Sequence, residues 1–130
     1  MITIQRIDHI VFTVRDIEAT CAFYKTVLGM EEVTFGQGRK ALRFGRQKIN
    51  LHQRGKEFEP KALSPTVGAA DVCFISSTPI EDVLRHLQAH QIKIEQGPVE
   101  RDGSQAKLRS VYIRDPDGNL IEISNELPSS

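Results

Sequence analysis

The chain begins with a strand-like pattern that is followed by a helix-like one. From residue 6 to 14 apolar and polar positions alternate, so that the aliphatic row faces one side and His9 faces the other. Residues 16–28 instead carry apolar side chains at helical spacing. Asp16 is suited to cap the start of this helix and Gly29 is suited to end it. The pattern therefore predicts a strand and then a helix.

The rest of the chain continues with short alternating stretches and one further helical stretch. We expect strands at 30–35, 39–44, 47–53, 70–76, 92–97, 107–114 and 120–124, and a helix at 78–90 with Thr78 as its N-cap. Glycines separate the strands of the first part, and the sequence DPDGN joins the last two strands.

The order strand, helix, strand, strand, strand occurs twice along the chain. When the two copies are aligned, His9 matches Asp71 and the two helices begin at matching positions. We therefore predict one domain over 1–130, with module one at 1–53, a linker at 54–69 and module two at 70–125. The expected class is α+β, with paired β-α-β-β-β modules whose curved mixed sheets surround a central cavity, a natural place for a small molecule.

Composition excludes several classes of partner. The 130 residues contain 17 basic and 17 acidic side chains, so no overall charge favours nucleic acid or an anionic membrane. No apolar run approaches the ~20 residues of a transmembrane helix, and no secretory signal is visible at the start. Cys21 and Cys73 stand apart, and we interpret both as small core residues. A cytoplasmic protein is expected.

Strand alternation brings several polar side chains to the face opposite the aliphatic rows: His9, Asn50, His52, Asp71 and Glu122. A carboxylate on an inward face is costly unless it is paired or bound to a cation. Imidazoles and carboxylates that converge from separate strands are the ligands of Zn²⁺, Ni²⁺, Mn²⁺ or non-haem Fe²⁺. Each residue alone is equally consistent with a hydrogen-bonded core or surface role, so the metal hypothesis depends on the whole set.

Three further polar residues alternate with apolar ones in their strands: Arg43, Tyr112 and Arg114. An arginine in such a position can bind a carboxylate or phosphate of a substrate. The two arginines can equally form structural ion pairs, and Tyr112 can equally belong to the core. Nothing in the chain matches a P-loop, a dinucleotide fingerprint or a Ser-His-Asp arrangement.

Two segments carry a resemblance to a known family. DHIVFTVRDIEATCAFYKTVLGM (8–30) and VYIRDPDGNLIEI (111–123) resemble the opening and closing signatures of the vicinal oxygen chelate superfamily. The middle segments KALRFG (40–45) and KINLHQ (48–53) are similar to those of small glyoxalase-like proteins, some described as virulence-associated. The superfamily includes glyoxalase I, bleomycin- and fosfomycin-resistance proteins, methylmalonyl-CoA epimerase and extradiol dioxygenases.

The resemblance implies a metal held by the first and last strands of each module. His9 then matches the first ligand and Glu122 the last, while the last strand of module one offers Asn50 or His52. We favour His52, because imidazole is the better ligand. Asp71 stands where the family normally has a histidine, and this departure puts a glyoxalase I activity in doubt.

The resemblance also implies a reaction class and a partner. We expect a lyase or isomerase similar to lactoylglutathione lyase. The expected enzyme depends on a divalent metal (Ni, Zn, Mn or Fe), and two oxygens of a small oxygen-rich substrate chelate this metal. Glu122 would also move a proton, and Arg43, Tyr112 and Arg114 would bind the substrate. The alternatives are a metal-free drug-binding resistance protein and, third, an extradiol-type dioxygenase. A homodimer is the expected assembly.

Overall fold

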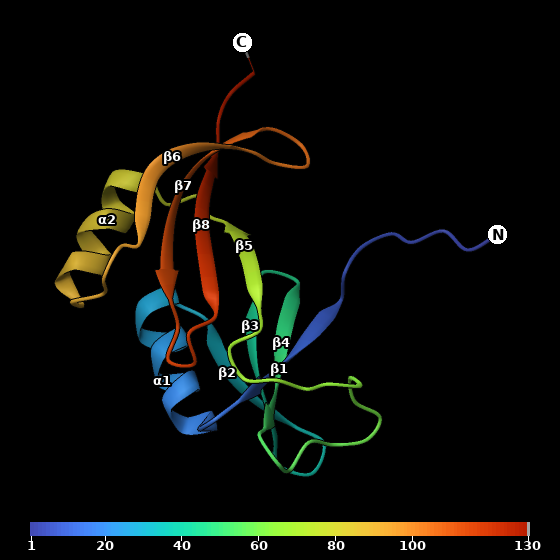
Figure 1. Cartoon of the computed structure of the whole chain (residues 1–130). Coiled ribbons are helices and arrows are strands. Elements are labelled where there is room, and N and C mark those ends of the chain that lie inside the picture. Colours follow the sequence, from blue (N-terminus) through green and yellow to red (C-terminus); the bar gives the residue numbers. More distant parts are fainter. Residues whose placement is uncertain (130) are drawn as a thin grey trace. The chain divides into compact units, whose positions relative to one another are not determined.

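The computed structural model describes residues 1–129. The chain divides into two compact units, the second of which begins at Ala69 after Gly68. Each unit contains one four-stranded mixed sheet and one helix in the order β-α-β-β-β (Figure 1). The predicted α+β class and the twofold repeat of this order are therefore confirmed. No helix within residues 1–129 is long and apolar enough to span a membrane.

The first unit pairs its first strand with its last. Its elements are β1 (His9–Val14), α1 (Ile17–Leu28), β2 (Glu31–Phe35), β3 (Arg39–Phe44) and β4 (Gln47–Gln53). The sheet order is β1-β4-β3-β2, and β1 runs parallel to β4 while the other neighbours are antiparallel. In this register His9 lies opposite Lys48 and Thr13 lies opposite His52.

Helix α1 has both predicted caps. Asp16 accepts hydrogen bonds from the backbone N–H groups of Glu18 and Ala19 at 2.9 and 3.3 Å. Gly29 ends the helix at a φ of 67°, in the left-handed region that glycine adopts without a steric penalty. The apolar face of the helix packs on the sheet, where the rings of Phe12 and Tyr24 meet edge to face.

The second unit repeats this arrangement. Its elements are β5 (Asp71–Ile75), α2 (Ile80–Ala89), β6 (Gln96–Asp102), β7 (Lys107–Arg114) and β8 (Leu120–Glu126). The order is β5-β8-β7-β6, with β5 parallel to β8. Apolar residues of β7 and β8 are buried on one face together with those of α2: Val111, Ile113, Ile121, Ile123, Ile80, Val83 and Leu87.

Strand β6 differs from the prediction at 92–97. It begins at Gln96 and continues through Gly97 and Pro98 to Asp102. The sequence predicted that this strand ends at Gly97. β6 is an edge strand, where proline is tolerated, and its register on β7 shifts between Gln96 and Val99. The consequence for function is that Arg101 lies in a strand.

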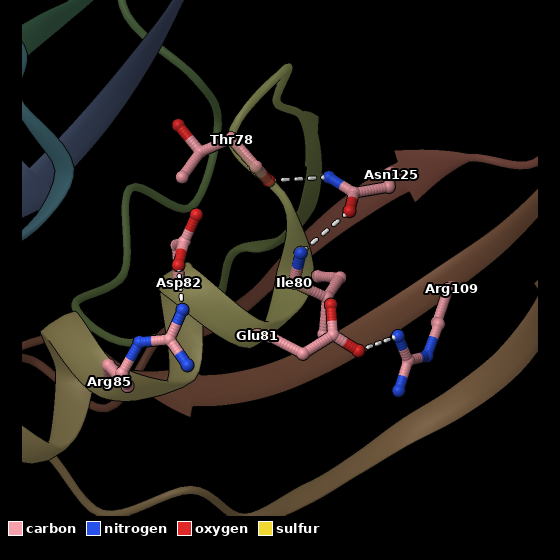
Figure 2. Close-up of polar contacts among 7 residues, drawn as sticks. All are labelled: Thr78, Ile80, Glu81, Asp82, Arg85, Arg109 and Asn125. Carbon is pink, nitrogen blue, oxygen red and sulfur yellow. Dashed lines mark hydrogen bonds and ion pairs between the residues drawn. The ribbon is translucent and has the colours of Figure 1, made fainter.

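The start of α2 also differs from the prediction. The N-cap is Pro79, and Thr78 makes no side-chain capping bond. Asn125 of β8 caps the helix instead: its Oδ1 accepts from the Ile80 N–H at 2.8 Å and its Nδ2 donates to the Thr78 carbonyl at 2.8 Å (Figure 2). The same Nδ2 donates to the Ser76 carbonyl. A long-range contact therefore replaces the local cap.

The two cysteines have different surroundings. Cys21 is buried in α1, as predicted. Cys73 lies in β5, as predicted, but it is exposed and not part of the core. The reason is strand parity, because Cys73 is on the polar face of the sheet together with Asp71.

We predict that Asn125→Ala lowers the free energy of unfolding by about 1–2 kcal/mol, because the Ile80 N–H and two carbonyls lose their partner. Thr78→Ala is the matched control and should change stability by less than about 0.5 kcal/mol, as no side-chain cap is lost. Urea denaturation followed by circular dichroism measures both. Equal losses in the two variants would contradict the assignment of the cap to Asn125.

We also predict that Gly97→Ala is much more destabilising than Gly118→Ala. Both glycines have positive φ, 107° and 86°, so each substitution strains the backbone by about 1 kcal/mol. A Cβ at Gly97 would in addition collide with the backbone of Ser110 in β7, whereas Gly118 has open space. Thermal unfolding should therefore show a far larger fall for Gly97→Ala. Similar melting temperatures would mean that β6 does not pack closely on β7.

Candidate functional site

The polar face of the second sheet gathers most of the predicted site residues of module two. Asp71 and Cys73 of β5 share this face with Glu122 of β8, because Cys73 pairs with Glu122. In β7, Tyr112 pairs with Glu122 and belongs to the same face. The opposite face is covered by α2, so the polar face is where a ligand of this unit can bind.

A cavity of about 390 Å³ opens on this face. It is lined by Asp71, Glu95, Gln96, Arg101, Tyr112, Arg114, Leu120 and Glu122. The structure therefore brings together four of the residues singled out from the sequence: Asp71, Tyr112, Arg114 and Glu122. Carboxylates and guanidinium groups on one cavity can bind a cation and an oxyanion respectively.

Glu122 is held by hydroxyl groups. Its Oε2 accepts from Ser110 Oγ at 2.6 Å and from Ser124 Oγ at 3.3 Å, and the two hydroxyls are 2.6 Å apart. No ion pair joins Glu122 or Asp71 to a basic side chain within residues 1–129. The charge of Glu122 is thus oriented but not neutralised, as a metal ligand or a general base requires.

A second cavity of about 420 Å³ adjoins Glu122 and Arg101 on the same sheet and includes Cys73. The Cys73 Sγ lies 3.3 Å from Ser124 Oγ. Although the Cys73 residue is exposed overall, desolvation of its sulfur raises the pKa of the thiol above its ordinary value, which favours the protonated form.

Arg101 is a cavity residue that sequence reasoning missed. Its Nε donates to the Tyr112 hydroxyl at 3.0 Å, and its guanidinium lies 5.6 Å from the centre of that ring. It lines both cavities. Alternation within 99–102 was the available signal, but it was hidden by the expectation that Pro98 lies outside a strand.

The other two arginines form ion pairs. Arg114 Nε lies 3.3 Å from Glu95 Oε1, and its Nη1 donates to the Gly118 carbonyl, so Arg114 lines the cavity but is partly engaged. Arg43 of β3 is bonded to Glu31 through Nε and Nη2 at 2.9 and 2.5 Å. It belongs to the first unit, and the structural ion pair that the sequence left open is present at this position.

His9 begins β1 in the first unit and is exposed. Its Nδ1 lies 2.9 Å from Asp8 Oδ2. The hydrogen bond with His9 lowers the pKa of Asp8 below its ordinary value. A carboxylate on one ring nitrogen leaves the other, Nε2, available to a ligand, as in many metal-bound histidines.

His52 is buried in β4, where its Nε2 lies 3.3 Å from Arg39 Nη2. Burial, followed by the Arg39 charge, lowers the pKa of His52, so the neutral ring is favoured. His52 lies four positions beyond the partner of His9, so about 13 Å separates the two along the strands. The structure does not bring these two predicted ligands together.

The register also relates Asn50 to Glu122. Asn50 pairs with Val11, the third residue of β1, and Glu122 pairs with Cys73, the third residue of β5. His52 corresponds in the same way to Ser124. Asn50 is therefore the module-one counterpart of Glu122, which alternation alone could not determine.

The donors of the second unit fit a hard divalent cation in part. Asp71 and Glu122 face one cavity and are not paired with a basic group, which suits oxygen coordination. Among residues 1–129, however, no three His, Cys, Asp or Glu side chains lie close enough to hold a metal ion. A complete ligand set would need further donors in addition to these two carboxylates.

Comparison with known proteins places the chain in one family. Residues 6–123 match the family described as the Glyoxalase/Bleomycin resistance protein/Dioxygenase superfamily. The virulence protein STM3117 of Salmonella typhimurium is 62% identical over 121 residues, which cover 93% of this chain and 84% of that protein. Its crystal structure superimposes with a TM-score of 0.96, covering 97% of this chain and 100% of the solved chain.

The names of further relatives state either a glyoxalase domain or an activity. The glyoxalase domain-containing protein RDO1 of Mycosarcoma maydis is 54% identical and covers 95% of this chain and 70% of that protein. The metallothiol transferase FosB of Staphylococcus epidermidis is 29% identical, over 92% and 81% of the two chains. A lactoylglutathione lyase structure from Agrobacterium tumefaciens is 26% identical, with a TM-score of 0.71 and coverage of 92% of each chain.

The family match extends over most of the chain and includes both segments whose motifs resemble the superfamily signatures. The high identity and structural similarity to STM3117 agree with it. The chain therefore belongs to the glyoxalase/bleomycin resistance protein/dioxygenase superfamily, as its sequence motifs predicted.

Proposed function

We propose that the protein is a divalent-metal-dependent lyase or isomerase of the glyoxalase type that acts on a small oxygen-rich substrate. The cavity of the second unit is the observation that carries this proposal, because Asp71 and Glu122 face the same space as Arg101 and Tyr112. Relatives whose names state a lactoylglutathione lyase and a metallothiol transferase activity support it.

The metal in this proposal would be Ni, Zn, Mn or Fe, and its chemistry would be stabilisation of negative charge that develops on the substrate oxygens. Glu122 and Asp71 would hold the metal through their carboxylate oxygens. In the first unit, Asn50 occupies the position that corresponds to Glu122, and His9 and His52 lie about 13 Å apart along the strands, so those two histidines would not share one ion.

Glu122 is the proposed general base. It takes a proton from a hydroxyl-bearing substrate carbon next to a carbonyl and returns that proton to the carbonyl carbon, while the hydroxyl proton passes to the carbonyl oxygen, so that the substrate is isomerised and no atoms are lost. Ser110 and Ser124 donate to its Oε2, which fixes the orientation of the carboxylate. The base keeps the proton only between the two transfers.

Arg101, Tyr112 and Arg114 are the proposed substrate-binding residues of the second unit. The bond from Arg101 Nε to the Tyr112 hydroxyl holds both groups at the cavity and leaves the other guanidinium nitrogens to bind a substrate oxyanion. Arg43, the other arginine expected from the sequence, would have to leave its pair with Glu31 in order to bind substrate.

We further propose that the protein is a cytoplasmic homodimer. β1 is an edge strand of its sheet, and Ile10 and Val11 on it are exposed, as are Ile2, Ile4 and Ile7 before it. Exposed apolar residues at an unpaired strand edge favour association with another chain.

The first prediction of this proposal concerns metal content. Untagged protein should contain a near-stoichiometric divalent metal by elemental analysis, and both Asp71→Asn and Glu122→Gln should reduce it at least tenfold. Glu126→Gln, an exposed carboxylate at the end of the same strand, should retain the metal. Protein that neither contains nor takes up metal would exclude chelation and favour the metal-free binding function.

The second prediction concerns the reaction. With metal bound, the protein should form lactoylglutathione from methylglyoxal and glutathione, followed by absorbance of the thioester. Glu122→Gln should lower kcat about 100-fold or more, since a general base contributes about 10²–10⁴, while Glu126→Gln should not. Metal-loaded protein without this activity would exclude this substrate and leave other isomerase or dioxygenase substrates to be tested.

A further inference from the structure

The polar face of the first sheet carries basic side chains that the proposed reaction does not use. Arg39 of β3 and Lys48 of β4 share this face with Asn50 and His52, because His52 and Lys48 alternate with apolar residues and Arg39 reaches the His52 ring. The equivalent face of the second unit carries Asp71 and Glu122 together with Arg101 and Arg114, so it presents both signs of charge.

Arg39 is enclosed by aromatic rings and lacks an anionic partner. The centres of the Phe35 and Phe58 rings lie 5.0 and 4.6 Å from its guanidinium carbon. Its Nη2 contacts His52 Nε2 at 3.3 Å, while its Nε is buried without a hydrogen-bond partner. A guanidinium with an unsatisfied N–H favours an oxyanion ligand.

Lys48 contacts the Phe35 ring, as Arg39 does. Its Nζ is 3.7 Å from the centre of the Phe35 ring, so two cations share one ring. Within residues 1–129 neither Arg39 nor Lys48 forms an ion pair with a carboxylate. Lys48 affects Asp8 only at longer range, by helping to lower its pKa.

Asn50 is a second residue on this face with a buried polar atom that has no hydrogen-bond partner. The side chain is 5% exposed, and its Oδ1 is buried without a hydrogen-bond partner. Asn50 lies between Lys48 and His52 on the same face of β4. Unsatisfied buried polar atoms cost about 1–3 kcal/mol each, so two on one small surface require an explanation.

The remaining charges nearby do not neutralise the cluster. Glu57 and Lys61 of the loop after β4 influence His52 with opposite signs. The Glu57 carboxylate is engaged with the Gly55 N–H at 2.9 Å. Phe58, which covers Arg39, belongs to the same loop and is 44% exposed.

We propose that Arg39 and Lys48, flanked by Phe35 and Phe58, form a binding site for the anionic group of a small organic acid whose apolar part contacts the two rings. The anion is a carboxylate or a phosphonate, since a guanidinium and an ammonium bind either through charge-assisted hydrogen bonds. This site requires no metal, and it is independent of the reaction proposed for the second unit.

Nuclear magnetic resonance titration of the full chain tests the proposal with three ligands that share a benzyl group. Phenylacetate and benzylphosphonate carry the two candidate anions, and 2-phenylethylammonium carries the opposite charge. We expect one or both anions to shift the backbone amide signals of β3 and β4 in a saturable manner, with a Kd of about 1 mM or tighter. The ammonium ligand should not bind there.

Variants assign the binding to the two cations. Arg39→Gln and Lys48→Gln should each weaken the anion at least tenfold. Arg46→Gln, an exposed arginine in the turn between the same strands, should leave the Kd unchanged. Dispersed amide spectra show that each variant is folded, and if Arg39→Gln does not fold, Lys48→Gln alone decides the question.

Three results would overturn the proposal: no saturable shift by either anion up to about 20 mM, equal binding of the ammonium ligand, or unchanged affinity in the folded Arg39 and Lys48 variants. Each would mean that the cations only pack on the rings. Because none of these measurements depends on metal or turnover, failure here leaves the proposed reaction of the second unit untouched.

Discussion

The parallel pairing of β5 with β8 is the constraint on which the candidate site depends. Two asparagines of the last strand region fix it at both ends. Asn119 Oδ1 accepts from the Ala70 N–H at 2.8 Å just before β5 begins, and Asn125 binds the Ser76 carbonyl just after β5 ends. If β5 shifted by one residue along β8, every side chain of β5 would point to the opposite face of the sheet. The two asparagine contacts therefore help to keep Asp71 and Glu122 in the lining of the same cavity.

The turn that precedes β8 supports the same constraint. Asp115 Oδ1 accepts from the N–H groups of Asp117 and Asn119 at 2.9 and 3.0 Å, and Asn119 Nδ2 donates to Asp115 Oδ2 at 2.8 Å. Asn119 therefore has both of its amide atoms in use, one toward the turn and one toward β5. The local turn chemistry read from DPDGN thus also positions a strand far away in the sequence.

Local signals were sufficient for most of the fold. Alternation and caps predicted nine of the ten elements close to their observed positions, because Asp16, Gly29 and the hairpin glycines act on adjacent backbone. The exceptions depend on distant partners. Pro98 is accepted in β6 because that strand is at an edge, and α2 is capped by Asn125, which lies 45 residues further along the chain. Neither fact is visible from nearby residues.

The candidate site likewise has features that follow from local sequence signals and features that depend on distant partners. Parity alone predicts that Glu122, Asp71 and Tyr112 share a face, since that requires only the period of a strand. Whether Asn50 or His52 is the counterpart of Glu122 depends on the register of β1 on β4, which parity does not give. The distance between His9 and His52 depends on the same register. Arg101 requires knowledge that β6 continues past a proline.

The two units differ in how far the polar side chains on one face of the sheet have hydrogen-bond partners. In the second unit Ser110 and Ser124 satisfy Glu122, so the network is complete apart from its negative charge. In the first unit the Oδ1 of Asn50 and the Nε of Arg39 stay unsatisfied beside cations. An apolar residue at either position would remove that cost, so stability alone does not account for the choice of residues. An oxyanion bound to Arg39 would offset the cost at its Nε, and that is the physical basis for proposing that the first unit binds an anion, in addition to the reaction proposed for the second unit.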